Sequence, residues 1–379
     1  SLHIVYILCL HLCLLILLMS EEIIKNRGWI LKIIIPVLGF GRAGGERVLS
    51  KLATELMNYG HDVSFVVPDN KTKPYYATTA NIITSKGSQN RVKIFRIIKV
   101  YYNLWRKCIE LNPDAVVAGF HLTAYLVTLL PINRRKKFYY IQAYEANFFD
   151  NKIRKLIASL TYSLPLNKIL NSPNLLPHKY GDFIGVVPAG VDLNVFYPRT
   201  KNRLLNGHKS IGIIGRKEKH KGTSEIISVL CALENKIGII INIAIYLGEI
   251  DKERLIAAGF KVNFIPITSD SELASFYRSN DIMIAVGLIE DGAFHYPCAE
   301  AMACGCLVIS NYAPLTETNS ILKLDNFDAC KLGEAINRCL NLNFEEKSKE
   351  IQSNISVLDK YGWKIVGEKF NNLLLNANK

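Results

Sequence analysis

The chain is 379 residues long, which is too long for one small core and suits two α/β domains of ordinary size. Apolar residues make up 49% of the sequence and charged residues 21%, which fits a globular protein and argues against disorder. The nine cysteines lack the paired spacing of a zinc site, so we expect reduced, mostly buried thiols.

The positive charge of the chain is unevenly distributed. The formal net charge is +13, and residues 1–190 hold 24 Lys and Arg against 11 Asp and Glu. Residues 191–379 hold 22 of each kind, so the whole excess lies in the first half. This asymmetry predicts an anionic partner for the first half, which could be a nucleic acid, a membrane surface or a charged substrate.

Residues 1–18 form an apolar segment without Lys, Arg, Asp or Glu that only just reaches the length of a bilayer-spanning helix. No basic region precedes it and no small-residue cleavage site follows it, which argues against a secretory signal. The segment is either a membrane anchor or upstream sequence, with the functional chain beginning at Met19. We favour upstream sequence, because a complete domain with its own strand begins soon afterwards.

The first half of the chain predicts one βαβ unit followed by further buried strands. An apolar run at 30–38 predicts a parallel strand, and a glycine-rich turn follows it. Apolar residues at helical spacing then predict a helix over 46–59, before a strand at 61–67. The stretch 91–111 is instead amphipathic, basic and aromatic. Further buried strands are predicted at 115–118, 138–142, 168–171 and 184–187.

A segment with Pro and Gly at 188–198 and a polar stretch at 199–209 interrupt this pattern and predict a linker. A second α/β series begins at 210–215. Its later strands are predicted at 239–247, 262–265, 282–286 and 307–310. The repeated order of strand, glycine turn and helix predicts two doubly wound α/β domains that face each other across a cleft.

Two turns have the composition of phosphate-binding loops. Gly44 and Gly45 open a helix, where backbone N–H groups and the helix dipole attract anions, although tight-turn packing also explains them. The loop 215–222 places Arg216 and Lys221 between a buried strand and a helix, where ligands bind in α/β sheets. Arg216 can grip phosphate oxygens as a fork and Lys221 acts as a point charge; the alternative is a solvated basic loop.

A loop with Gly and Pro at 291–297 leads into a short helix of small residues. Glu300 lies near the start of this helix. Its carboxylate either complements the helix dipole or accepts hydrogen bonds from both hydroxyls of a ribose, as acidic residues do in other doubly wound nucleotide sites.

Four motifs follow one another along the chain. They are Gly-Gly-Glu-Arg-Val at 44–48, Pro-Ala-Gly-Val-Asp-Leu-Asn-Val-Phe-Tyr-Pro at 188–198, Gly-Arg-x4-Lys-Gly at 215–222 and Pro-x-x-Glu-Ala-Met-Ala-Cys-Gly at 297–305. In this order they resemble the family-four retaining glycosyltransferases, and the resemblance covers residues 30–375. It implies the α/β GT-B fold, in which two facing Rossmann-like, doubly wound domains enclose an interdomain cleft.

The resemblance also implies a domain order and a function. We expect an acceptor domain at 19–198, a nucleotide-sugar domain at 199–355, and a C-terminal helix at 356–379 that packs back towards the first domain. The implied enzyme is a hexosyltransferase-type glycosyltransferase that moves a sugar from a nucleotide-diphosphate donor to a saccharide or lipid-linked acceptor. Its context would be bacterial-type surface polysaccharide synthesis, such as lipopolysaccharide O-antigen or capsule. The alternatives are a sugar-nucleotide epimerase of related fold and a catalytically weak scaffold that binds a nucleotide sugar.

By the same resemblance, Arg216 and Lys221 hold the donor diphosphate, Glu300 holds the ribose, and Gly44 with Gly45 approaches the sugar phosphate. No cofactor is implied, because the nucleotide sugar is a substrate. We also expect no metal ion. The sequence has no Asp-x-Asp pair, and two cations can replace Mg²⁺ in neutralising the leaving group.

The chain departs from the family pattern at two positions. Gly292 stands where members usually carry a glutamate. We expect Glu290 or Asp291 to substitute for it from a shifted loop, or His295 to take over contacts to the sugar, so these three are candidate catalytic residues. Gln142 stands where many members carry an active-site histidine.

The first domain supplies further candidates. Gln142 and Glu145, followed by Phe148 and Phe149, resemble a subgroup that transfers rhamnose-type sugars, and we expect them to contact the acceptor or line the cleft. His121 follows a predicted strand and is a candidate general base, with packing or acceptor contact as the alternative.

Two basic segments of the first domain suggest a membrane partner. Residues 91–107 interleave cations with aromatic side chains, and 134–137 is a run of four cations. The interpretations are docking on anionic lipid head groups or an ordinary solvated face. A nucleic acid is disfavoured, because no known binding module is present. We therefore expect a cytoplasmic protein, peripheral at the inner face of the cell membrane.

Overall fold

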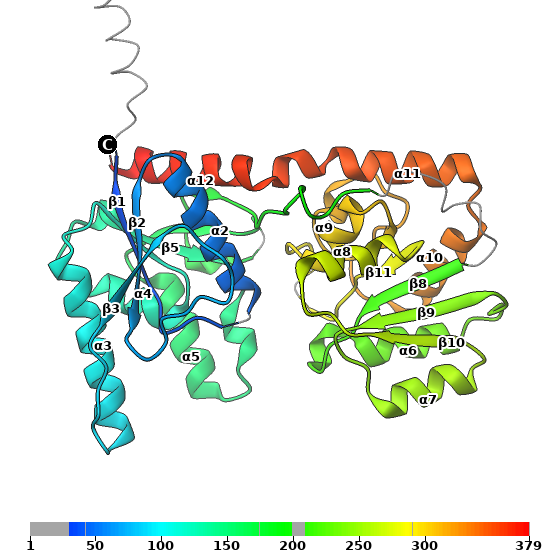
Figure 1. The fold of residues 1–379 in the computed structure, drawn as a ribbon, viewed down its shortest axis with the longest axis horizontal. Helices are drawn as coiled ribbons and strands as arrows, with labels where there is room; N and C mark the ends of the chain where they lie inside the picture. The colour runs from blue at the N-terminus through cyan, green and yellow to red at the C-terminus, as the bar shows by residue number, and fades with distance from the viewer. Residues whose placement is uncertain (1–29, 42, 174, 199–208, 290, 379) are drawn as a thin grey trace, which may run out of the picture. The chain divides into compact units, whose positions relative to one another are not determined.

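The computed structural model describes residues 30–378 except 42, 174, 199–208 and 290 (Figure 1). The apolar segment 1–18 and Glu290 therefore lie outside the described residues. Two compact units are distinguished. One holds the residues up to Tyr139, with Pro165–Asn167 and the residues from Asn371 on; the other holds Tyr140–Leu164 and Lys168–Phe370. The expected domain boundaries stay a prediction.

The first sheet has seven strands in the order β3-β2-β1-β4-β5-β6-β7. Its inner strand β1 pairs in parallel with β2 and β4, and its isoleucines Ile33, Ile34 and Ile35 are at most 2% exposed. A strand buried on both faces is apolar throughout rather than alternating, which is why the sequence shows a continuous run there. The strands are β1 (Lys32–Pro36), β2 (Asp62–Pro68), β3 (Asn81–Ser85), β4 (Ala115–Ala118), β5 (Lys137–Ile141), β6 (Asn167–Leu170) and β7 (Gly185–Val186).

The helices connected to this sheet bury their apolar stripes unequally. In α2, Val48, Leu49, Leu52 and Leu56 recur at helical spacing and are buried. The α-helices are α2 (Gly44–Asn58), α3 (Lys93–Glu110), α4 (His121–Thr128), α5 (Lys152–Leu160) and, at the end of the chain, α12 (Trp363–Asn378). Short 3₁₀ turns are η1 (Arg134–Lys136), η2 (Glu145–Phe148), η3 (Thr161–Ser163) and η4 (His178–Tyr180).

Along α12, residues that follow one another make different contacts. Phe370 packs its ring edge-on to Tyr140, with centroids 5.3 Å apart. Asn371 Oδ1 lies 2.6 Å from His61 Nε2. The second contact satisfies both of its groups, because a buried amide and a buried imidazole each need a hydrogen-bond partner.

The second sheet has five parallel strands in the order β10-β9-β8-β11-β12. Successive residues of β11 point to opposite faces, so Ile282 and Ile284 join one core cluster and Met283 joins another. The strands are β8 (Lys209–Ile214), β9 (Ile239–Ala244), β10 (Lys261–Ile265), β11 (Ile282–Ile284) and β12 (Leu307–Ile309).

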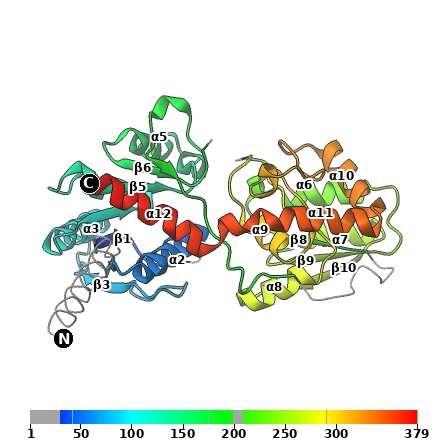
Figure 2. The same cartoon turned by 90° about the horizontal axis from the view of Figure 1, so that it is seen from above.

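Helices cover both faces of the second sheet. The α-helices are α6 (Thr223–Cys231), α7 (Glu249–Ala257), α8 (Asp270–Arg278), α9 (Tyr296–Ala303), α10 (Ala329–Asn341) and α11 (Phe344–Ser356). Helices α6 and α10 contact each other, and α9 contacts both α8 and α11 (Figure 2). The 3₁₀ turns are η6 (Lys219–Lys221), η7 (Leu315–Glu317) and η8 (Leu358–Tyr361).

The predicted alternation of strands and helices in two halves is confirmed. Each strand predicted from an apolar run exists, with ends that differ by a few residues. One strand was not predicted, β3, because only Ser85 of its five residues is buried and the segment carries no apolar run. The amphipathic stretch 91–111 forms α3.

Candidate functional site

The loop after β8 is fixed by its backbone. Gly215 N–H donates to the carbonyl of Ala244 at 2.9 Å, and a Cβ on Gly215 would lie 1.8 Å from the carbonyl oxygen of Tyr246. Only glycine fits such an approach. The next residue, Arg216, donates its backbone N–H to Thr223 Oγ1 at 2.9 Å. The backbone of Arg216 at the carboxyl end of β8 is thus fixed by its neighbours, and its side chain is exposed.

The same loop is tied to the segment that follows β11. Gly222 separates η6 from α6 and has a φ of +71°, a left-handed conformation that favours glycine. Leu288 N–H donates to the carbonyl of His220 at 2.9 Å. Lys221 therefore lies next to the loop that carries Asp291.

Asn311 organises that second loop, although its side chain is completely buried. Its Nδ2 donates to the carbonyl of Gly287 at 2.8 Å and to Asp291 Oδ1 at 2.5 Å. Its Oδ1 accepts from Gly287 N–H at 3.1 Å, and its backbone carbonyl accepts from Gly292 N–H at 2.8 Å. Tyr312 OH adds a bond to the carbonyl of Ile289 at 2.9 Å. Five hydrogen bonds from two adjacent residues hold the loop.

Gly292, which stands where the family that the sequence resembles usually carries a glutamate, has a left-handed conformation. Its φ is +74°, and no atom lies within 4 Å of a Cβ built there. A glutamate would have room but would need a backbone conformation that L residues rarely adopt. The acid next to it, Asp291, is exposed and bonded to Asn311.

His295 is the N-cap residue of α9, although its side chain makes no capping hydrogen bond. Its backbone N–H donates to the carbonyl of Ala313 at 3.0 Å, and its ring packs 4.4 Å from the ring of Tyr312. Within the described part of the chain, its buried Nδ1 has no hydrogen-bond partner. Burial lowers the pKa of His295 well below its usual range, and the charges of Lys221 and Arg216 lower that pKa further. The imidazole is therefore neutral at pH 7.

Glu300 lies one turn further along α9 and is 1% exposed. Tyr277 OH donates to its Oε2 at 3.0 Å. Burial raises the pKa of Tyr277 well above its usual range, the Glu300 carboxylate raises that pKa further, and the charge of Arg216 opposes both. Arg216 thus acts electrostatically on both His295 and Tyr277, the hydrogen-bond partner of Glu300.

Four predicted residues are therefore brought together beside the second sheet: Arg216, Lys221, His295 and Glu300. The arrangement combines two cations, a neutral imidazole and a buried carboxylate. Cations at the carboxyl end of a strand suit a diphosphate, and a fixed carboxylate suits a vicinal diol. Among the described residues, no group of three or more His, Cys, Asp or Glu is placed to hold a metal ion.

The candidates of the first sheet follow the carboxyl ends of two neighbouring strands. Gly44 and Gly45 open α2 after β1, and His121 opens α4 after β4. The carboxylate of Glu46, in the first turn of α2, accepts a hydrogen bond from Gly41 N–H. His121 is buried, and its ring lies 4.1 Å from that of Phe120.

Gln142 and Glu145 lie after β5, among tyrosines. Glu145 is buried in η2, and its carboxylate adds to the effect of burial in raising the pKa of Tyr162. The Tyr144 ring stacks on the Tyr162 ring at 5.3 Å, and Tyr144 OH lies 3.3 Å from Tyr180 OH. The roles expected for Gln142 and Glu145 stay predictions.

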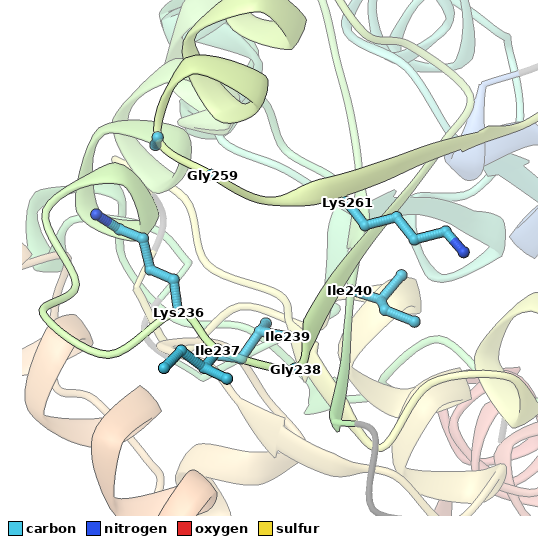
Figure 3. Close-up of a pocket in the computed structure, with 8 residues that line it drawn as sticks. Lys236, Ile237, Gly238, Ile239, Ile240, Gly259 and Lys261 are labelled. Atoms are coloured by element: carbon cyan, nitrogen blue, oxygen red, sulfur yellow. The ribbon is translucent and has the colours of Figure 1, made fainter.

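A hollow lies at the opposite edge of the second sheet (Figure 3). It is formed by the amino ends of β9 and β10, whereas Arg216 follows a carboxyl end. The side chains of Lys236 and Lys261 extend to opposite sides in Figure 3 and do not converge on a common point. We therefore do not consider it a ligand site.

Sequence reasoning missed Tyr277, Asn311 and Tyr312. Asn311 carried a weak signal, because a polar residue directly after a buried strand lies at the edge where ligands bind. Tyr277 carried none. It lies in α8, and only the tertiary structure places its hydroxyl on Glu300.

No protein-family model matches the sequence, and no curated protein does either. Solved structures are similar in fold. HepE of Anabaena in complex with UDP-glucose has a TM-score of 0.69 at 12% identity, over 91% of this chain and 100% of that chain. A glycosyltransferase of Rickettsia africae has a TM-score of 0.65 at 16% identity, over 92% and 99%. The lipopolysaccharide outer core galactosyltransferase WaaB has a TM-score of 0.65 at 12% identity, over 91% and 99%.

These similarities define the class of fold. The two sheets with their helices form the GT-B fold, as the resemblance implied. At such identities, the similarity defines the fold alone.

The neutral state of His295 predicts a pH dependence of stability. Its pKa in the folded protein lies below the value of about 6.5 expected when unfolded, so protonation favours unfolding. The stabilisation is present above about pH 6.5 and is lost as the pH falls below it. His295→Gln should therefore lose less melting temperature than the parent between about pH 7.5 and about pH 5. His220→Gln is the control, and equal losses in all three proteins would contradict the assignment.

Proposed function

We propose that the protein is a glycosyltransferase that moves a sugar from a nucleoside-diphosphate donor to a saccharide or lipid-linked acceptor. The observation that carries this proposal is the placement of four residues after neighbouring strands of the second sheet. Arg216 and Lys221 follow β8, and the segment that leads to His295 and Glu300 follows the adjacent strand β11. The GT-B proteins of similar structure support it, since HepE binds UDP-glucose and WaaB is a galactosyltransferase. UDP is therefore the first nucleotide to test.

Each residue has a role in this proposal. Arg216 and Lys221 neutralise the charge that develops on the departing diphosphate, which is usually the largest catalytic contribution in such reactions. Glu300 accepts hydrogen bonds from the ribose, and Tyr277 holds its carboxylate in place. The neutral His295 presents a buried ring nitrogen that can bond a sugar hydroxyl without adding charge. The reaction needs no metal ion or cofactor.

The finer assignment rests on the sequence motifs. It comprises family-four membership, retention of configuration, a rhamnose-type or other hexose donor, and surface polysaccharide synthesis in the cytoplasm. For retention, the departing phosphate deprotonates the acceptor from the same face of the sugar.

A scaffold that binds the nucleotide sugar without transferring it is a second candidate. Its support is the replacement of the family glutamate by Gly292, together with the bond between Asp291 and Asn311. The two functions differ in whether the sugar is transferred: a glycosyltransferase releases nucleoside diphosphate as it transfers the sugar, and a scaffold only binds the nucleotide sugar.

The deciding experiment measures the release of nucleoside diphosphate with and without a saccharide acceptor fraction. The glycosyltransferase proposal expects release that depends on the acceptor and survives EDTA, because Arg216 and Lys221 supply the positive charge. Nucleotide binding without release would support the scaffold. Loss of transfer in EDTA with rescue by Mg²⁺ would contradict the metal-free mechanism.

The membrane-facing part of the proposal rests on α3, which extends away from the first sheet (Figure 1). Of its residues only Leu104 and Cys108 are buried, and Trp105 Nε1 donates to the carbonyl of Leu129 at 3.1 Å. Apolar side chains in its first half are more than half exposed: Ile94, Phe95, Ile97 and Ile98. Cations surround them, which suits an anionic lipid surface.

The run 134–137 contributes less to that surface than its charge suggests. Lys136 forms an ion pair with Asp114 at 3.4 Å, and Lys137 Nζ donates to the carbonyl of Thr128 at 2.7 Å. Burial lowers the pKa of Lys137. None of the helices in the described residues combines the length and apolarity needed to cross a membrane. We propose a peripheral association at the inner face of the cell membrane.

A further inference from the structure

Helix α5 is exposed on almost every side. Of its nine residues, Lys152–Leu160, only Ala158 is buried. In Figure 2 the helix lies beyond β5 and β6, and it contacts the short turns η2 and η3. Asn151 caps it, with Oδ1 accepting from Ile153 N–H at 3.0 Å and Arg154 N–H at 3.2 Å. The local sequence therefore sets the helix without much packing.

The exposed surface of α5 includes an apolar stripe. Ile153 is 69% exposed, Leu156 59%, Ile157 39% and Leu160 52%. Their spacing of i, i+3, i+4 and i+7 places all four on one face of the helix. Helices this short are marginal in water and normally owe their stability to burial of such a face. The stripe is thus the face that a partner would cover.

The charges of α5 indicate which partner. Between Asn151 and Leu160 the sequence has three cations and no acid. At 3.6 residues per turn, Lys152 and Arg154 lie about 100° to either side of the stripe. Their long side chains can keep their charges at head-group level while the stripe enters the acyl region. A second copy of the same helix would bring like charges together, which disfavours self-association.

We infer that α5 inserts its Ile153, Leu156, Ile157 and Leu160 face into an anionic bilayer. This surface is distinct from the basic segments read from the sequence, although α3 also exposes apolar side chains. Attraction between exposed charges and lipid fades as salt rises, whereas burial of an apolar face does not. The inference does not depend on the donor chemistry proposed above.

A tryptophan in the stripe tests the insertion locally. In the full chain, Leu156→Trp should show a blue-shifted emission and quenching by brominated lipid when phosphatidylglycerol vesicles are added. Ile256→Trp, on α7, is the matched control, because Ile256 is 54% exposed and α7 carries acids in its first turn. Beyond the response of the parent chain, neither change is expected in the control. The parent chain already has three tryptophans, among them Trp105 on α3, so each spectrum is compared with that of the parent chain under the same conditions, and only a change beyond the parent's own reports α5.

A second pair of variants measures the contribution to binding. Leu156→Ser with Leu160→Ser should weaken partition into phosphatidylglycerol vesicles at high salt by about tenfold or more, whereas Ile250→Ser with Ile256→Ser should not. The melting temperature with UDP is recorded for each variant, so a failure of nucleotide binding is seen separately. An unshifted Leu156→Trp spectrum, or a shift that appears on self-association without lipid, would overturn the inference.

Discussion

Replacing Arg216 or Lys221 by alanine should slow sugar transfer by about a hundredfold or more, because each removes one stabiliser of the charge that develops on the leaving diphosphate. The loop geometry makes the prediction specific. Arg216 is held by the bond from its N–H to Thr223, and Lys221 by the bond between His220 and Leu288. Neither substitution removes these backbone bonds. The measurement is acceptor-dependent release of nucleoside diphosphate, with the melting temperature as a check of folding.

Lys219→Ala is the matched control, since Lys219 is an exposed cation of the same loop and has no assigned role. Arg216→Lys separates charge from geometry, because lysine keeps the charge but loses the bidentate fork. We expect it to fall between the parent and Arg216→Ala. A second readout is the pKa of His295, which should rise when either cation is removed. Near-normal turnover in both alanine variants would refute the donor site.

Much of the fold could be predicted because most of its strands are buried and carry apolar runs, although β10, none of whose five residues is buried, was also found. Runs such as Ile33–Ile35 leave little choice of structure, and the glycines that follow them mark the turns. The strand β3 could not be found in this way, because four of its five residues are at least partly exposed. A strand whose residues are partly exposed on both faces need not show an apolar run or an alternation of apolar and polar residues.

The sequence predicted those site residues that lie in a loop or helix start marked by nearby glycine or proline. Arg216, Lys221 and Glu300 lie in loops or helix starts whose glycines and prolines are visible in the sequence. Asn311 and Tyr277 act through tertiary contacts, and their hydrogen bonds join residues 20 or more positions apart. No local pattern encodes such a pairing.

The stripe on α5 was missed for a related reason. Its spacing is visible in the sequence, but apolar residues at i, i+3, i+4 and i+7 ordinarily face a core. Only the structure shows that Leu156 and its neighbours are exposed. The same pattern in α2 is buried, so spacing alone does not distinguish a core face from an interaction surface.

Replacing Glu300 by glutamine should weaken binding of a ribonucleoside diphosphate by about tenfold to a hundredfold, since hydrogen bonds to a charged group contribute about 1.5 to 3 kcal/mol. Glutamine keeps the size of the side chain and leaves an acceptor for Tyr277 OH, so the buried site stays filled. The sharper expectation concerns selectivity. The parent should bind UDP more tightly than 2′-deoxy-UDP, and the variant should bind the two almost equally. Calorimetric titration of both nucleotides measures this directly.

Tyr277→Phe is the control for position, because it leaves the carboxylate and removes one bond that holds it. It should weaken UDP binding less than Glu300→Gln and should keep a preference for the ribonucleotide, since the charged acceptor remains. A double substitution that costs no more than Glu300→Gln alone would show that Tyr277 acts through Glu300. If Glu300→Gln still prefers UDP over its 2′-deoxy form by the parent's factor, Glu300 does not contact that hydroxyl, and its carboxylate serves the start of α9 instead.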